Sequence, residues 1–253
     1  MINVKNLWKS YGSLTVLKGL DLTVNEGETV VILGRSGVGK SVLLRQILGI
    51  ELPDKGDVHV NDMDISKMNE TERYEAIKRM GMLFQGAALF DSMTVGENVA
   101  FYLRQHNKEL SENEIQERVA HSLDVVNLAD MQKKMPSDLS GGMRKRAALA
   151  RVIIYSPKII LYDEPTTGLD PITAQHINEL INHTQEKLKA TSIVVTHDIR
   201  SALQVGDRLA FHHEGKIYLI AGKKEFLESK DPILEEFFAD AILSEKYLQK
   251  ILK

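Results

Sequence analysis

The sequence contains no cysteine among its 253 residues. Without thiols a chain forms neither a disulfide framework nor a thiolate-ligated zinc or iron–sulfur site. It also lacks an excess of charge of one sign, since 32 Lys and Arg face 35 Asp and Glu, for a net charge of −3. A polyanion such as nucleic acid would therefore have to be met by a local basic site rather than by the whole surface.

Long apolar runs are missing too. No stretch reaches the roughly 18 apolar residues that span a bilayer, and the N-terminal sequence shows no apolar signal core. We therefore expect any membrane association to come through a partner. With 43% hydrophobic and 26% charged residues, the composition is that of an ordinary globular protein with a sizeable core.

The hydrophobic pattern predicts an α/β fold. Short alternating runs within residues 1–31 predict antiparallel strands. Helical periodicity between about residues 94 and 154 predicts an inserted helical subdomain. Asp231 and Pro232 are expected to begin a helical C-terminal extension, residues 231–253, after a main domain of residues 1–230. Continuous apolar runs, typical of strands buried on both faces of a parallel sheet, occupy residues 29–33, 81–84, 158–163 and 192–196, and a hairpin is expected over residues 208–220.

A glycine-rich loop follows the first of these buried strands and precedes a helical pattern. Its sequence satisfies G-x-x-x-x-G-K-[ST], in which inward-facing backbone N–H groups and a helix N-terminus bind phosphate. Lys40 is expected to reach the β- and γ-phosphates of a nucleotide, and Ser41 to hold Mg²⁺. The candidate nucleotide-binding residues here are Gly34, Arg35, Ser36, Gly37, Val38, Gly39, Lys40, Ser41 and Val42.

Two adjacent acids, Asp163 and Glu164, end the strand predicted at residues 158–163. Carboxylates at the mouth of a buried strand are costly unless a cation or a reaction needs them. We expect Asp163 to orient Mg²⁺ through its coordination shell and Glu164 to polarise an attacking water.

Leu-Ser-Gly-Gly-Met at residues 139–143 opens a predicted helix, with Ser140 placed to cap it. This segment resembles the signature sequence of ABC ATPases, and other elements of that family occur in the expected order. The matching positions are Tyr11 for the adenine-stacking aromatic residue, Gln85 for the Q-loop, Asp170 for the D-loop and His197 for the switch histidine. The resemblance extends from Tyr11 to about Ile220.

The resemblance implies a P-loop NTPase core of ABC type with an N-terminal antiparallel β subdomain and an inserted α-helical subdomain. It implies ATP hydrolysis with Mg²⁺, in which Glu164 is the catalytic base, His197 contacts the γ-phosphate and Gln85 senses the metal and the water. Ser41, Gln85 and Asp163 are then the metal-site residues, and Val16 joins Tyr11 among the ATP contacts. Two such subunits close head to tail in this family, so that Ser140, Gly141, Gly142 and Met143 face the nucleotide of the partner subunit.

Spacing favours a transporter subunit within the family. The 100 residues from Lys40 to Ser140 leave no room for a long coiled-coil insertion, and the single P-loop differs from the tandem arrangement of translation factors. Met143 stands where most signatures have Gln. With that residue, segments 139–151 and 83–90 are similar to those of the MCE-associated, Mla-type phospholipid transport branch.

The Mla-type resemblance implies a homodimer bound to a membrane permease at the cytoplasmic face of the inner membrane. An MCE-type protein and a small accessory subunit are further candidate partners, and no nucleic acid is expected. The sequence leaves open whether Phe90 lines a groove for the permease or packs the helical subdomain, and whether the tail packs on its own domain or reaches a partner. An ABC ATPase for another substrate, or a soluble one that clamps a protein or nucleic acid, remains an alternative.

Overall fold

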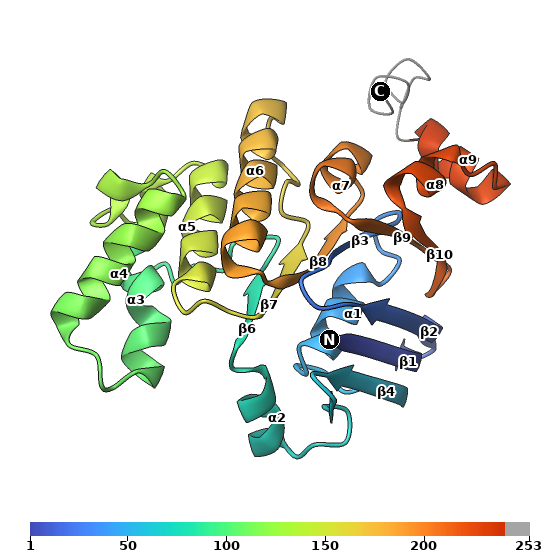
Figure 1. Cartoon of the computed structure of the whole chain (residues 1–253), viewed down its shortest axis with the longest axis horizontal. Coiled ribbons are helices and arrows are strands. Elements are labelled where there is room, and N and C mark those ends of the chain that lie inside the picture. The colour runs from blue at the N-terminus through green and yellow to red at the C-terminus, as the bar shows by residue number, and fades with distance from the viewer. Residues whose placement is uncertain (241–253) are drawn as a thin grey trace. The chain divides into compact units, whose positions relative to one another are not determined.

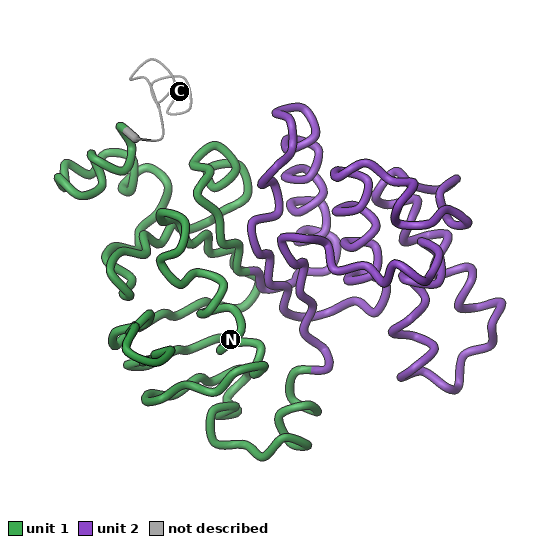
Figure 2. The backbone as a smooth tube through the Cα atoms, turned by 180° about the vertical axis from the view of Figure 1, so that it is seen from behind, with its two compact units in different colours: residues 1–77, 193–253 green, residues 78–192 purple. Residues whose placement is uncertain are grey.

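The computed structural model describes residues 1–240 (Figure 1). The chain divides into two compact units (Figure 2). Unit 1 comprises Met1–Ile77 and the chain from Ile193 onward, and unit 2 comprises Lys78–Ser192. The helical subdomain expected at about residues 94–154 lies within unit 2.

Unit 1 begins with an antiparallel sheet. Its strands are β1 (Ile2–Tyr11), β2 (Leu14–Val24), β4 (Lys55–Val60) and β5 (Met63–Asp64), in the order β2-β1-β4-β5. Ile2 pairs with Val24 on one side and with Val60 on the other, and all three side chains are buried. This sheet is the predicted N-terminal β subdomain.

The remaining strands of unit 1 include β3, which leads directly into the phosphate loop, residues 34–41. Strand β3 (Thr29–Leu33), buried throughout, pairs in parallel with β9 (Arg208–His213), and β9 forms the predicted hairpin with β10 (Lys216–Gly222). Strand β8 (Thr191–Thr196) carries the chain from unit 2 into unit 1. The helices of this unit are α1 (Lys40–Ile47), α2 (Glu70–Ile77), α7 (Ile199–Val205), α8 (Lys223–Glu228) and α9 (Pro232–Asp240).

Unit 2 combines two buried parallel strands with helices. Leu83 of β6 (Met80–Leu83) pairs with Tyr162 of β7 (Ile159–Asp163). The helices are α3 (Val95–His106), α4 (Glu112–Val125), α5 (Gly141–Ile153) and α6 (Pro171–Leu188), with short 3₁₀ turns at Ala129–Met131 and Pro136–Asp138. Thr94 and Ser111 begin α3 and α4 with reciprocal capping boxes, which fix where these helices start.

Helix α9 packs on its own unit. The Asp231 carboxylate accepts hydrogen bonds from the backbone N–H groups of Ile233 and Leu234, as expected for the predicted helix start. Leu234 is fully buried, and the Phe237 ring lies 4.9 Å from that of Phe211 on β9. The remaining apolar positions of the predicted tail face, Ala241, Leu248 and Leu252, lie outside the described residues.

Within residues 1–240, none of the helices has the length and apolar character needed to cross a bilayer.

Candidate functional site

The phosphate loop is shaped by two glycines in the left-handed region. Gly37 has φ +81° and Gly39 has φ +104°, which other residues rarely adopt. A Cβ on Gly39 would lie 2.5 Å from Val16 Cγ1, and one on Gly34 would lie 2.6 Å from the carbonyl oxygen of His212. The loop therefore lies directly against β2 and β9. Val16, predicted as an ATP contact, is a neighbour of the loop.

Lys40 begins α1 and is only 5% exposed. Its Nζ donates to the carbonyl oxygens of Gly34, at 2.8 Å, and of Arg35, at 2.9 Å. The ammonium is thus held inside the curve of the loop, where phosphate oxygens are the natural acceptors for it. Ser41 and Val42 follow in the first turn of α1 and are half-buried, while Arg35 and Ser36 are exposed.

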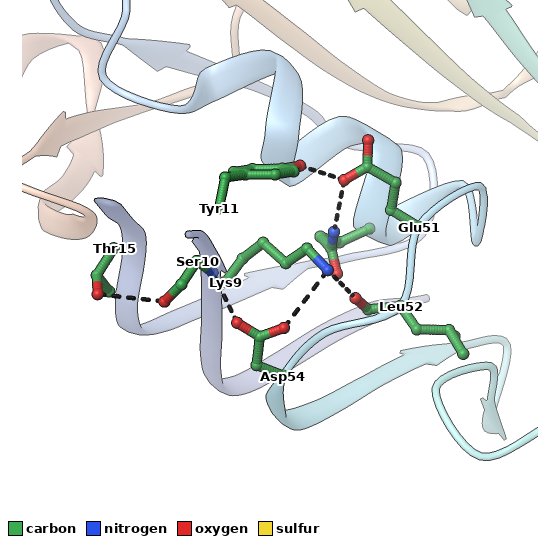
Figure 3. Close-up of polar contacts among 8 residues, drawn as sticks. Lys9, Ser10, Tyr11, Thr15, Glu51, Leu52 and Asp54 are labelled. Atoms are coloured by element: carbon green, nitrogen blue, oxygen red, sulfur yellow. Dashed lines mark hydrogen bonds and ion pairs between the residues drawn. The ribbon is translucent and has the colours of Figure 1, made fainter. Parts of the chain in front are cut away.

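Tyr11 stands at the end of β1 with its hydroxyl toward Glu51 (Figure 3). The residue is 43% exposed. Its hydroxyl donates to Glu51, whose other oxygen pairs with Arg45 at 2.7 Å. Burial, together with Glu51, raises the pKa of this phenol. Lys9 Nζ lies 5.6 Å from the ring centre and donates to the Leu52 carbonyl oxygen at 2.7 Å. The ring is anchored at its polar end, an arrangement suited to stacking on a base.

His197 follows β8 directly and is exposed. The next residue, Asp198, caps α7 by accepting from the backbone N–H of Arg200 at 2.9 Å. Its own N–H donates to the Thr196 hydroxyl at 3.0 Å. The imidazole is therefore carried on a short connection that is hydrogen-bonded on both sides.

The predicted catalytic residues of unit 2 share one sheet edge. Because Leu83 pairs in parallel with Tyr162, Gln85 and Glu164 each follow two residues after a paired position, at the carboxyl ends of β6 and β7. Gln85 is exposed, whereas Asp163 and Glu164 are each 7% exposed. Ligands and reacting groups of parallel sheets gather at this edge.

Glu164 has an unusual backbone. Its φ of +47° lies in the left-handed region, which is uncommon for a residue other than glycine. The Thr167 hydroxyl donates to Glu164 Oε2 at 2.8 Å, and the N–H of Thr167 donates to the Glu164 carbonyl oxygen at 3.3 Å. The turn over residues 164–167 thus holds both the main chain and the carboxylate of Glu164.

The signature segment and the D-loop lie side by side. The Ser140 hydroxyl accepts from the N–H of Met143 at 3.3 Å, which confirms that Ser140 caps α5. A Cβ on Gly142 would lie 2.4 Å from Thr173 Cγ2, so this glycine permits close contact with α6. Asp170 caps α6 through the N–H groups of Ile172 and Thr173. Ser140 and Gly141 are exposed at the N-terminus of α5.

Phe90 packs within unit 2, as one interpretation of its segment expected, and also keeps an exposed face. It packs on Phe101 with ring centres 4.8 Å apart, yet it remains 42% exposed. Next to this ring pair is a 220 Å³ cavity, lined in part by Phe101, Met93 and Arg104. Arg151 of α5 donates to the Ala88 carbonyl oxygen at 2.7 Å and to that of Ala87 at 3.1 Å, which ties the segment after Gln85 to the signature helix.

The sequence pattern did not single out Lys145 or His212. Lys145 belongs to a basic run, Arg144 to Arg146, and charged runs of this kind are typical of solvated faces, but it is 5% exposed. Its position on the same helical face as Ala148 and Leu149 could have indicated burial. His212 lies in the predicted hairpin and is 1% exposed beside the phosphate loop.

Known proteins show the same organisation. The family model described as "ABC transporter" matches residues 17–167. The ATP-binding cassette MJ0796, solved as a dimer in a post-hydrolysis state bound to ADP and Pi, is 32% identical with a TM-score of 0.82, over 88% of this chain and 98% of that one.

Two curated relatives are similar over most of this chain. The intermembrane phospholipid transport system ATP-binding protein MlaF of Haemophilus influenzae is 40% identical over 94% of this chain and 89% of its own length. The probable ribonucleotide transport ATP-binding protein mkl of Mycobacterium leprae is 39% identical over 93% of this chain and 68% of its own length.

Together with the phosphate loop and the signature helix, these similarities define an ATP-binding cassette. The chain belongs to the ABC transporter family. It is an ATP-binding subunit that hydrolyses ATP.

Proposed function

We propose that this chain powers phospholipid transport between membranes. The observation that carries the proposal is the similarity to the phospholipid transport protein over nearly the whole of both chains, together with Met143 in the signature segment. The name of the mycobacterial relative favours a second candidate, an ABC ATPase for another cargo such as ribonucleotides. The ATPase chemistry is common to both candidates.

The residue roles form part of the proposal. Lys40 and the N–H groups of residues 34–41 bind the ATP phosphates, and Tyr11 stacks on adenine with Val16 beside it. Glu164 takes the proton of the attacking water, and Gln85 and His197 orient the water and the γ-phosphate. These groups supply positioning and charge, which are most of what phosphoryl transfer needs.

The predicted metal residues fit Mg²⁺ by their chemistry. Ser41, Gln85 and Asp163 offer hydroxyl, amide and carboxylate oxygens, the hard donors that Mg²⁺ prefers alongside water and phosphate oxygens. When bound, Mg²⁺ supplies charge that stabilises the leaving phosphate groups. Asp163 is 7% exposed, so its carboxylate is desolvated and gains from a cation partner.

The membrane partner is proposed to be a permease. The exposed face of Phe90 and the adjoining 220 Å³ cavity offer a docking surface, and the cavity is lined by the apolar Met93 and Phe101 together with polar residues that include Arg104 and Glu97. A helix end that inserts an apolar side chain between such polar groups fits this surface. Binding there would place the chain at the cytoplasmic face of the inner membrane as a homodimer, and an MCE-type protein would complete the assembly.

An affinity purification tests the cargo. The tagged chain is recovered from detergent-solubilised native membranes, and accompanying proteins are identified by mass spectrometry. Recovery of a permease together with an MCE-type protein and bound phospholipid supports the proposal. A permease with a different binding protein would replace the phospholipid with another cargo, and the absence of any membrane protein would favour a soluble clamp.

Two substitutions test the residue roles. Lys40→Ala is expected to weaken nucleotide binding, because it removes the charge that the loop encloses. Glu164→Gln is expected to bind ATP normally and to turn it over at least about a hundredfold more slowly, because an amide cannot take a proton. Hydrolysis by Glu164→Gln at the parent rate would show that another group is the base.

A further inference from the structure

Lys145 is a buried lysine with an unusual set of partners. It lies in the second turn of α5, five residues after Ser140, and is 5% exposed. Its Nζ donates to the Glu164 carbonyl oxygen at 3.1 Å and to the Thr167 carbonyl oxygen at 2.8 Å. The signature helix is therefore hydrogen-bonded to both ends of the turn that holds Glu164.

This turn needs an external restraint. The φ of +47° at Glu164 is disfavoured for a residue with a Cβ and persists only where surrounding contacts hold it. Within the turn, the Thr167 hydroxyl fixes the carboxylate through Oε2. The Lys145 ammonium is bonded to the main chain of the same two residues, so that it braces the turn from the helix side.

A buried lysine at this position costs desolvation free energy. Burial lowers the pKa of Lys145 to about 8, despite the opposing effect of the Glu164 charge, because the charged form is desolvated. An apolar side chain of the same length would pack beside Ala148 and Leu149 without that cost. What the ammonium adds is two directed bonds to carbonyl oxygens.

We propose that Lys145 is a positioning residue for ATP hydrolysis, which holds the backbone of Glu164 at a fixed place relative to the signature helix. The inference rests on the proposed role of Glu164 as the base. The N-terminus of the same helix presents Ser140 and Gly141, which are proposed to face the nucleotide of a second subunit. Lys145 thereby links the residues that detect that nucleotide to the acid that acts in its own subunit.

The test compares two substitutions on one helix, each of which removes the hydrogen bonds of a basic side chain. Lys145→Met removes the bonds to the Glu164 turn. Arg146→Met is the matched control, because Arg146 also donates to two carbonyl oxygens, those of Val126 at 3.2 Å and Asn127 at 3.0 Å, which belong to the end of α4 and not to the Glu164 turn. ATPase activity is measured on the chain purified with its accompanying membrane proteins. We expect Lys145→Met to lower kcat by about tenfold or more with the KM for ATP changed by less than about threefold, and Arg146→Met to change neither by more than about threefold.

A second comparison separates positioning from general damage. In a Glu164→Gln background there is no base to position, so adding Lys145→Met should lower the residual rate by less than about threefold. A further tenfold loss there, or an unchanged kcat in the single variant, would overturn the inference. If Lys145→Met does not fold, Lys145→Ala, which also removes both bonds, takes its place in both comparisons. Failure of the proposed function gives a different result, in which Glu164→Gln itself hydrolyses ATP at the parent rate.

Discussion

His212 is a buried imidazole beside the phosphate loop. Neither ring nitrogen has a hydrogen-bond partner among residues 1–240, and the side chain is 1% exposed. Burial, reinforced by the charges of Lys40 and His213, lowers the pKa of this imidazole to about 4. The ring is therefore neutral in the folded protein at pH 7, and its protonation is linked to unfolding.

Replacing His212 should change the acid stability of the protein. The folded pKa of about 4 lies below the unfolded value of 6.5, so the unfolded state binds the proton first as the pH falls. Between pH 7 and pH 5 this linkage lowers the free energy of unfolding of the wild type by about 2 kcal/mol. His212→Leu should not show this decrease. Urea unfolding of both proteins at several pH values measures the difference. The exposed His176→Leu serves as the control, and parallel pH dependences for wild type and His212→Leu would contradict the assignment.

Tyr11 separates the roles of a ring and a hydroxyl. If the exposed ring stacks on adenine, Tyr11→Ala should weaken ATP binding by about tenfold, the order of one base–aromatic stack. Tyr11→Phe keeps the ring, loses only the bond to Glu51, and should bind ATP within about threefold of the wild type. Calorimetric titration measures both. Equal weakening by the two variants would assign the effect to the Glu51 contact.

At the scale of elements, α9 is held by aromatic packing. Phe237 is 5% exposed against Phe211, and Phe238 is 8% exposed with its ring 5.9 Å from that of Phe226. Phe237→Ala should lower the free energy of unfolding by about 3 kcal/mol, through lost burial and the cavity left behind. Thermal unfolding measures this, with the exposed Glu235→Ala as control. A Tm unchanged by Phe237→Ala would mean that α9 does not pack stably on its own unit.

The elements that sequence predicts best are those with one dominant periodicity. The buried runs of β3, β6 and β7 have it, and their positions were predicted to within a few residues. Helices α3 and α4 lie inside the region predicted to be helical. Strand β4 was not predicted, because Lys55, Gly56 and Asp57 hide its alternation. Lys145 was not singled out for a related reason: a basic side chain usually lies at the surface, and only tertiary contacts show that this one is buried.

The sequence predicts which residues belong to the candidate site, but not the hydrogen bonds that hold them in place. The glycines, the lysine and the adjacent acids can be recognised from their residue types and spacing in the sequence. The structure adds that Gln85 and Glu164 lie at one sheet edge. The left-handed backbone conformation of Glu164 and its hydrogen bond from Thr167 could not be predicted from the sequence, because neither follows from a local sequence pattern. The assignment of roles to these residues stays a prediction until activities are measured.

At the scale of the whole molecule, the proposed homodimer can be tested at the exposed N-terminus of α5. Glu164→Gln with ATP should elute as a dimer in gel filtration, because each signature helix then meets an unhydrolysed γ-phosphate. Adding Ser140→Arg should restore the monomer by filling that surface, while Ser137→Arg, at another exposed serine, should leave the dimer intact. Dimers that survive Ser140→Arg would place the contact elsewhere.

The parallel register of β6 and β7 limits where the gene can gain or lose a codon without moving a site residue. Since side chains alternate across a sheet, removing a single residue from Met80–Leu83 would reverse the face on which Gln85 emerges, even with every other amino acid kept. The same deletion within residues 107–110, in the loop between α3 and α4, would leave both strand ends in place. Length variation among descendants of this gene should therefore accumulate in that loop and be absent from the strand.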